Sequence, residues 1–124
     1  DNIFAVMKEK GGEVLLSGID ESVWEDYREY VQLHQQRMKT HNIKWRALLC
    51  EGDTDFLPGS AVKTRYRWIP ESLFTQLLYY VYADRFALVL WGKPIRITII
   101  RNKLVAESFR RQFEMNWKNG KVPK

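Results

Sequence analysis

The sequence predicts a single-domain α/β sandwich: a mixed sheet of about five strands, with a long helix after strand 1 and a C-terminal helix. Three observations predict this. Short apolar runs closed by Gly or Pro are typical of buried strands. Two longer segments repeat apolar residues at helical spacing. The length of 124 residues suits one domain, so we assign residues 1–124 to a single α/β domain.

The first half of the chain alternates strand and helix signals. Residues 2–10 predict a helix end, which the glycines at 11–12 stop, and "EVLLSG" at 13–18 predicts a buried strand. "SVWE" at 22–25 has the form of a capping box, so we expect a helix from there to about Thr40. "IKWRALLCEG" at 43–52 predicts the second strand.

The second half contains the remaining strands. Residues 53–63 are the most loop-like, and "TRYRWIP" at 64–70 alternates as a half-exposed strand does. Residues 71–78 indicate a helical turn or an irregular approach to the next strand. Residues 83–85 suit a tight turn, and 86–91 and 95–100 predict strands joined by Gly92-Lys93-Pro94. The last helix follows Asn102 as its cap and ends at Gly120, with a buried stripe of Val105, Phe109, Phe113 and Trp117.

Composition limits the function classes. The net charge of +5 permits anionic partners without requiring them. Cys50 is the only cysteine, which excludes an internal disulfide and favours a cytoplasmic location. No apolar run reaches the length of a membrane span, and no signal peptide is visible, so we expect no membrane partner. The chain begins at Asp1, which is consistent with a processed chain or an excised domain.

No pattern typical of catalysis or metal binding stands out. His34 and His41 are seven residues apart, about 10 Å along a helix, too far for one metal ion. No phosphate loop and no nucleophile elbow occurs. Ser17 ends a strand, but no nearby histidine in the sequence could act as its base. Asp53 and Asp55 lie in a loop, and two carboxylates alone are weak evidence for a cation site. We therefore predict no catalytic residue, no metal site and no cofactor.

Basic and aromatic residues alternate in one predicted strand. Arg65 and Arg67 alternate with Tyr66 and Trp68, a mixture that binds nucleic-acid strands or sugars. The same mixture also forms ordinary outer faces of sheets, because strands are enriched in aromatic residues. Basic residues also gather at the C-terminal helix, where a solvated face is the commoner explanation.

Residues 66–117 resemble a known family. In TrmB-like transcriptional regulators, the C-terminal domain ends with Arg-x-Ile/Leu-Pro, then Tyr-Gly-Asp-Lys-Val-Ala, then Leu-Ala-x-Ser-Phe-Arg-x-x-Phe-x-x-x-Trp. The counterparts here are "RWIP" at 67–70, "YADRFA" at 82–87 and "LVAESFR" at 104–110, with Phe113 and Trp117. The upstream strand, long helix and "HNIKWRAL" also fit the family, so the resemblance covers most of the chain. Most of these residues are packing residues.

The resemblance implies a fold similar to one half of a phospholipase D. Those enzymes carry a His-x-Lys-x-x-x-x-Asp motif on the strand that corresponds to the segment 79–102. With Asp84 as the aspartate, the histidine and lysine positions hold Leu77 and Tyr79. A shift by one gives Gln76, Leu78 and Ala83. Neither pair supplies the imidazole nucleophile and the cation that the chemistry requires. We therefore predict that the chain is not an enzyme.

The family resemblance implies a regulatory role. Its members carry an N-terminal helix-turn-helix that binds DNA, which we expect upstream of this chain. The implied function is an effector domain in transcription regulation, for ligand binding, for dimerisation as a homodimer, or for both. The effector would be a sugar or a similar small molecule. Ligands of α/β sheets bind at strand carboxyl ends, which gives the ligand-binding candidates Ser17, Gly18, Glu51, Arg67, Trp68, Tyr80 and Tyr82.

Two alternatives stay open at this point. One is a phosphodiesterase or nuclease relic with a phospholipase D-like fold, which measurable phosphodiester hydrolysis would revive. The other is a stand-alone nucleic-acid-binding module, suggested by the net charge and by the strand of Arg and aromatic residues.

Overall fold

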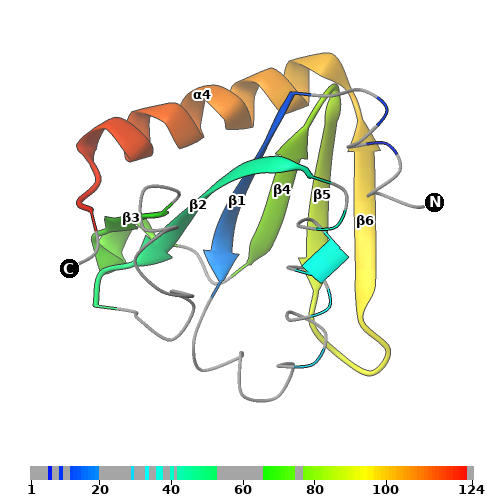
Figure 1. Ribbon diagram of the computed structural model, residues 1–124, viewed down its shortest axis with the longest axis horizontal. Coiled ribbons are helices and arrows are strands. Elements are labelled where there is room, and N and C mark those ends of the chain that lie inside the picture. The colour runs from blue at the N-terminus through cyan, green and yellow to red at the C-terminus, as the bar shows by residue number, and fades with distance from the viewer. Residues whose placement is uncertain are drawn as a thin grey trace.

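The computed structural model describes residues 6, 9, 12–19, 29, 33, 36–37, 40, 42–52, 66–74 and 77–122. In this part of the chain, a six-stranded mixed sheet carries one long helix across one face (Figure 1). The elements are β1 (Glu13–Ile19), β2 (Lys44–Cys50), β3 (Tyr66–Ile69), a 3₁₀ turn (Glu71–Leu73), β4 (Leu78–Tyr82), β5 (Arg85–Leu90), β6 (Arg96–Arg101) and α4 (Lys103–Asn119).

The strand order is β3-β2-β1-β4-β5-β6. Strands β1, β2 and β3 run parallel to one another, and β4, β5 and β6 continue the sheet in antiparallel fashion. Parallel neighbours need a crossover connection, whereas antiparallel neighbours need only a short turn. The tight turn at 83–84 and the turn after Leu90 supply the two short connections on the antiparallel side.

The α/β class is confirmed, but two details of the predicted fold are corrected. The sheet has six strands rather than about five, because Leu78–Tyr82 forms a strand of its own, β4. The long helix expected after strand 1 is not seen as an element. Residues 22–40 lie mostly outside the described part of the chain; within that range only Glu29, Leu33, Gln36, Arg37 and Thr40 are described, each in helical conformation.

The C-terminal helix forms where the sequence predicts it. Asn102 caps it by accepting a hydrogen bond from the Val105 backbone N–H at 3.0 Å, which satisfies one of the free donors of the first turn. Gly120 follows the last turn. Ala106 and Phe113 are fully buried beneath it, so the predicted stripe faces the sheet.

The core lies on both faces of the sheet because strand side chains alternate between them. The face beneath α4 buries Leu15, Leu48, Ile69, Tyr79, Val81, Phe86, Ala106 and Phe113. The opposite face buries Val14, Leu16, Ile43, Ala47, Leu49, Tyr66, Leu78, Tyr80, Tyr82, Ala87 and Val89.

The two edges of the sheet differ. At the β3 edge, Trp68 and Lys121 exchange backbone hydrogen bonds of 2.7 and 2.9 Å, so the segment after α4 folds back onto this strand. At the other edge, β6 pairs only with β5 among the described strands. Five of its six residues are exposed.

Candidate functional site

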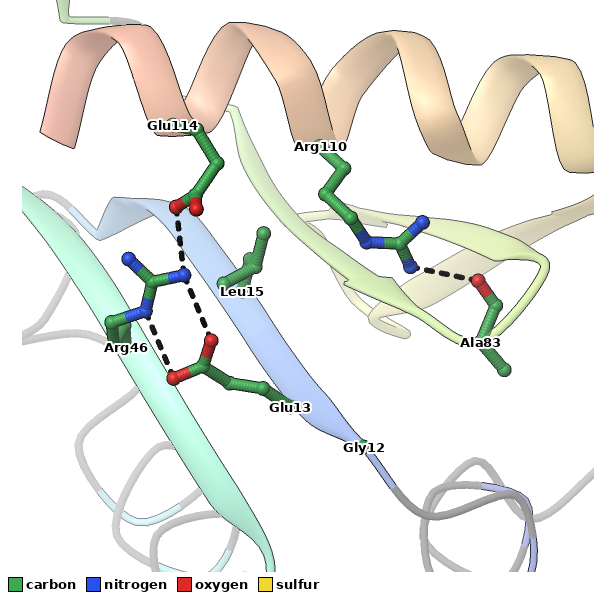
Figure 2. Close-up of a pocket in the computed structure, with 7 residues that line it drawn as sticks. All are labelled: Gly12, Glu13, Leu15, Arg46, Ala83, Arg110 and Glu114. Atoms are coloured by element: carbon green, nitrogen blue, oxygen red, sulfur yellow. Dashed lines mark hydrogen bonds and ion pairs between the residues drawn. The ribbon is translucent and has the colours of Figure 1, made fainter. Parts of the chain in front are cut away.

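A polar pocket lies between α4 and the starting ends of β1 and β2. Its volume is about 440 Å³, within the range of small-molecule sites. Figure 2 shows its lining, which comes from β1 and the residue before it, β2, the β4–β5 turn and α4: Gly12, Glu13, Leu15, Arg46, Ala83, Arg110 and Glu114. Two guanidinium groups and two carboxylates therefore line a single hollow.

Arg46 is the centre of the pocket's ion pairs. Its Nε and Nη2 donate to the two carboxylate oxygens of Glu13 at 2.9 and 2.8 Å, and Nη2 also contacts Glu114 at 2.7 Å. Partial burial lowers the pKa of Arg46, but the hydrogen bonds that it donates to Glu13 and Glu114 outweigh this effect, so the net pKa is raised. The bidentate pair fixes the plane of the guanidinium group.

Arg110 forms the other cationic wall. Its Nη2 donates to the Ala83 carbonyl oxygen at 2.8 Å (Figure 2). Ala83 has φ of +50°, a left-handed conformation that non-glycine residues rarely adopt. The helix thus holds the β4–β5 turn in place. Because Arg46 is already paired with two carboxylates, a ligand must compete with these ion pairs or use the remaining donors of Arg110.

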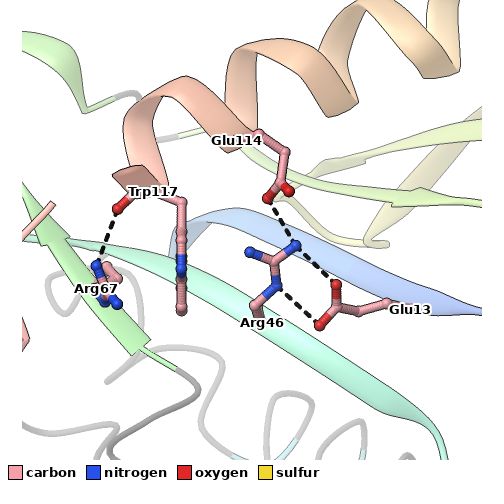
Figure 3. Close-up of polar contacts among 5 residues, drawn as sticks. All are labelled: Glu13, Arg46, Arg67, Glu114 and Trp117. Atoms are coloured by element: carbon pink, nitrogen blue, oxygen red, sulfur yellow. Dashed lines mark hydrogen bonds and ion pairs between the residues drawn. The ribbon is translucent and has the colours of Figure 1, made fainter. Parts of the chain in front are cut away.

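The ring of Trp117 lies between two guanidinium groups next to the pocket. The Arg46 guanidinium carbon is 4.9 Å from the ring centroid on one side, and that of Arg67 is 4.8 Å away on the other (Figure 3). Arg67 Nη1 also donates to the Trp117 carbonyl oxygen at 3.2 Å. This contact places a cation at the carboxyl end of α4, where the helix dipole favours it.

Three of the predicted ligand-binding residues lie at the carboxyl ends of β1 and β2. Ser17 is buried and its side chain is hydrogen-bonded to Tyr79. Gly18 has φ of +97°, and a Cβ there would lie 1.9 Å from the Leu77 carbonyl oxygen. Glu51 is exposed and contacts Lys121 Nζ at 3.4 Å.

The other four lie on opposite faces of the sheet. Arg67 is on the α4 face, stacked on Trp117. Trp68, Tyr80 and Tyr82 belong to the opposite face. Burial raises the pKa of Tyr82; the charge of Arg85 lowers this pKa, and the charge of Asp84 raises it. The seven candidates therefore do not converge on one hollow, and none of them lines the pocket.

The pocket residues were missed by the sequence analysis. Glu13 and Arg46 meet only because β1 and β2 pair in the register that sets Leu15 opposite Arg46. A register between strands 30 residues apart leaves no local pattern in the sequence. The one available signal was on α4, where Arg110 and Glu114 are four apart and thus share a helix face.

Gln76, one of the positions compared with the phospholipase motif, lies outside the described residues. The described positions hold surface, packing and turn residues. Leu77 is 51% exposed, and Tyr79 is buried against Phe86 and Phe109, with burial raising its pKa. Asp84 lies in the β4–β5 turn, 3.1 Å from Arg85 Nη1 and 3.6 Å from Arg101 Nε. Among the described residues, no three His, Cys, Asp or Glu side chains gather as a metal site.

Comparison with known proteins shows a shared fold. No protein-family model matches the sequence, and no curated protein is detectably similar to it. Among solved structures, the chain is similar to TrmBL2, an archaeal chromatin protein described as showing a novel mode of DNA binding. The match covers 95% of this chain with a TM-score of 0.58 and 16% identity. It covers 47% of TrmBL2, so this chain spans about half the length of that protein.

No helix in the described part of the chain is both long enough and apolar enough to cross a membrane.

Proposed function

We propose that this chain is the non-catalytic effector domain of a TrmB-like transcription regulator. The observation that carries the proposal is the fold likeness to TrmBL2, which covers nearly the whole of this chain but only half of that DNA-binding protein. The resemblance of residues 66–117 to TrmB-like C-terminal domains supports the same assignment.

The lining of the pocket supports binding rather than catalysis. A nucleophilic mechanism needs an available nucleophile next to a base, and the two carboxylates of the pocket, Glu13 and Glu114, are both ion-paired with Arg46. We propose that the pocket accepts a sugar or a similar small polar effector. Hydroxyl groups can donate to Glu13 or Glu114 and accept from Arg110, so one polyol can use both signs of charge.

The alternative of a stand-alone nucleic-acid binder is less well supported by the described residues. Stacking platforms for bases need exposed aromatic faces. The ring of Trp117 has a guanidinium group on each side, and Arg67 is held by the Trp117 carbonyl. Arg65, the other cation of that strand, lies outside the described residues.

A thermal-shift screen against sugars, sugar phosphates and nucleotides tests the effector proposal. A ligand that binds only the folded state stabilises it by about 2.7 kcal/mol at one hundred times its Kd. We expect a saturable rise in Tm for at least one compound. Arg110→Met should abolish the rise, whereas the matched Arg111→Met, exposed at the next position of α4, should preserve it.

Solution mass tests the pairing part of the proposal. A homodimer would have about twice the chain's 14.8 kDa by sedimentation equilibrium. A flat thermal response across the panel, together with a monomeric mass at all concentrations, would contradict both roles. Hydrolysis of a phosphodiester by the purified chain, lost in Asp84→Asn, would contradict the non-catalytic assignment.

A further inference from the structure

Among the described strands, β6 forms an open edge of the sheet. Its six residues pair with β5 in unbroken register from Arg85↔Arg101 to Leu90↔Arg96, so no bulge interrupts it. The other edge of the sheet is closed at Trp68 by the returning chain, whereas the described part of the chain contributes no strand outside β6. An edge strand presents a row of backbone N–H and C=O groups that can pair with another strand.

The middle of β6 lacks the features that usually protect an edge. Proteins place charges, prolines or bulges along such strands to prevent pairing. Here residues 97–100 are "ITII", four uncharged residues with strong β propensity. Ile97 and Ile100 are 37% and 41% exposed, on opposite faces of the strand. Leu90 and Leu104 add exposed apolar surface nearby on the chain, at 39% and 76%.

The charged residues within this strand and the segments that flank it in sequence are all basic. Between residues 85 and 106 the sequence has five Lys or Arg and no Asp or Glu. Arg96 and Arg101 stand at the two ends of β6, and Lys93 and Lys103 lie just beyond them. Of these four, Arg101 makes a long contact with Asp84 and is still 70% exposed. The edge is therefore apolar in its middle and cationic at both ends.

A second copy of the chain is a poor occupant of this edge. Two identical strands paired antiparallel about a two-fold axis must place each residue opposite one on the same face. Thr98 opposite Thr98 of the other copy meets this condition, with Ile97 opposite Ile99. The backbones of the two strands could therefore pair. However, each copy brings the four cations at and beyond the ends of β6, and no carboxylate between residues 85 and 106. Like charges at close range disfavour the pairing.

A nucleic acid is also a poor occupant. Phosphates would satisfy the four cations. They would leave the backbone donors and acceptors of β6 unpaired and would cover Ile97 and Ile100 without apolar contact. An extended acidic peptide satisfies the unpaired backbone, the apolar side chains and the cations together.

We propose that β6 binds an extended acidic segment of a partner protein as an added seventh strand. In such β-strand addition the backbone hydrogen bonds supply affinity and the side chains supply specificity. Apolar side chains on one face of the partner strand pack on Ile97, and Asp or Glu near the ends of that strand pair with Arg96 and Arg101. The proposal does not depend on the polar pocket or its effector.

The test uses a fluorescein-labelled peptide, Asp-Val-Glu-Val-Thr-Val-Glu-Val-Asp, and a control in which Lys replaces each Asp and Glu. Fluorescence anisotropy at low salt should show saturable binding of the acidic peptide and none of the basic one. Arg96→Glu should weaken binding at least about fivefold, because it turns an attraction into a repulsion. The matched Lys118→Glu, exposed on α4 and away from β6, should leave binding unchanged.

Amide hydrogen exchange of the unaltered protein shows how the peptide binds. Strand addition should slow exchange at every second amide of β6, namely those whose N–H groups point away from β5 and toward the added strand. Ile97→Glu gives a second variant that should weaken the acidic peptide without removing a core residue.

Three results would overturn the proposal. The first is equal binding, or no binding, of the two peptides. The second is acidic-peptide binding without slowed β6 amides. The third is displacement of the peptide by a 20-base-pair duplex at lower concentration than by unlabelled peptide, which would assign the edge to nucleic acid.

Discussion

Replacing Gly18 with alanine tests the most tightly constrained backbone contact in the sheet. Gly18 has φ of +97°, and a Cβ there would lie 1.9 Å from the Leu77 carbonyl oxygen and 2.8 Å from the Leu78 Cα. Real Cβ contacts essentially never fall below 3.0 Å. Because the neighbouring atoms are backbone, relief requires β1 and the start of β4 to separate next to the Ser17–Tyr79 pair.

The expected cost has two parts. A left-handed conformation costs a non-glycine residue about 1–2 kcal/mol. Forcing a methyl group into filled space costs about 1–3 kcal/mol more. Gly52→Ala is the matched control, since Gly52 has φ of +95° but nothing within 4 Å of its Cβ position. Gly52→Ala should lose only the stability that the left-handed conformation costs. The difference in the free energy of unfolding between the two variants therefore isolates the steric clash, at about 1–3 kcal/mol.

Urea denaturation followed by far-UV circular dichroism measures both free energies of unfolding. We expect Gly18→Ala to have the lower midpoint by a clear margin with an unchanged slope. Equal losses in the two variants, within about 0.5 kcal/mol, would refute the reasoning. The result also matters for function, because Gly18 is a predicted ligand-binding residue and a loss of binding in Gly18→Ala would follow from misfolding alone.

Four further predictions concern the structure. Tyr82→Phe should leave the free energy of unfolding unchanged or raise it by up to about 1 kcal/mol, because the buried hydroxyl has no hydrogen-bond partner among the described residues. A decrease of more than about 1 kcal/mol, measured by urea denaturation, would show that the hydroxyl is hydrogen-bonded. Burial raises the pKa of the Tyr82 hydroxyl above 10.0 in the folded state. The stability present below pH 10.0 should therefore fall as pH rises through the folded-state pKa. Urea midpoints measured from pH 8 to 11 should accordingly fall less in Tyr82→Phe than in the unaltered protein. Ala83→Gly should raise Tm by relieving the positive φ, whereas the control Ala87→Gly, buried within β5, should lower it. For Arg46→Met and Glu114→Gln, a double-mutant cycle should give a coupling below about 1 kcal/mol, since Glu114 is half exposed, and a coupling several times larger would contradict this.

The sequence predicts local features of the fold well. Helix α4 is specified within one segment by an Asn cap, a regular apolar stripe and a terminal glycine, and all three are found. Strand β4 was not predicted as a strand of its own. All five of its residues are buried, so it shows no alternation, and its apolar run continues directly into the turn at 83–84. Burial on both faces removes the signal on which strand prediction depends.

The candidate site depends on information that is not local. Strand ends can be located from sequence, which is why Ser17, Gly18 and Glu51 were placed at the carboxyl ends of β1 and β2. The face on which each side chain lies depends on exact strand bounds, and Arg67 and Trp68, adjacent in sequence, fall on opposite faces. The pocket joins β1, β2 and α4 through registers that no segment specifies by itself.

Helix α4 connects the two edges of the sheet. It begins at Lys103, with only Asn102 between it and β6, and Lys121, just after its C-terminal end, hydrogen-bonds Trp68 of β3 at the far edge (Figure 1). Its 17 residues extend about 25 Å, close to the width of about 24 Å that six strands span. A stiff rod fixed at both ends of a sheet resists changes in the sheet's twist. We therefore expect this domain to respond to a bound molecule by moving as a rigid body, so that any hinge that relays the event lies outside the sheet and its helix.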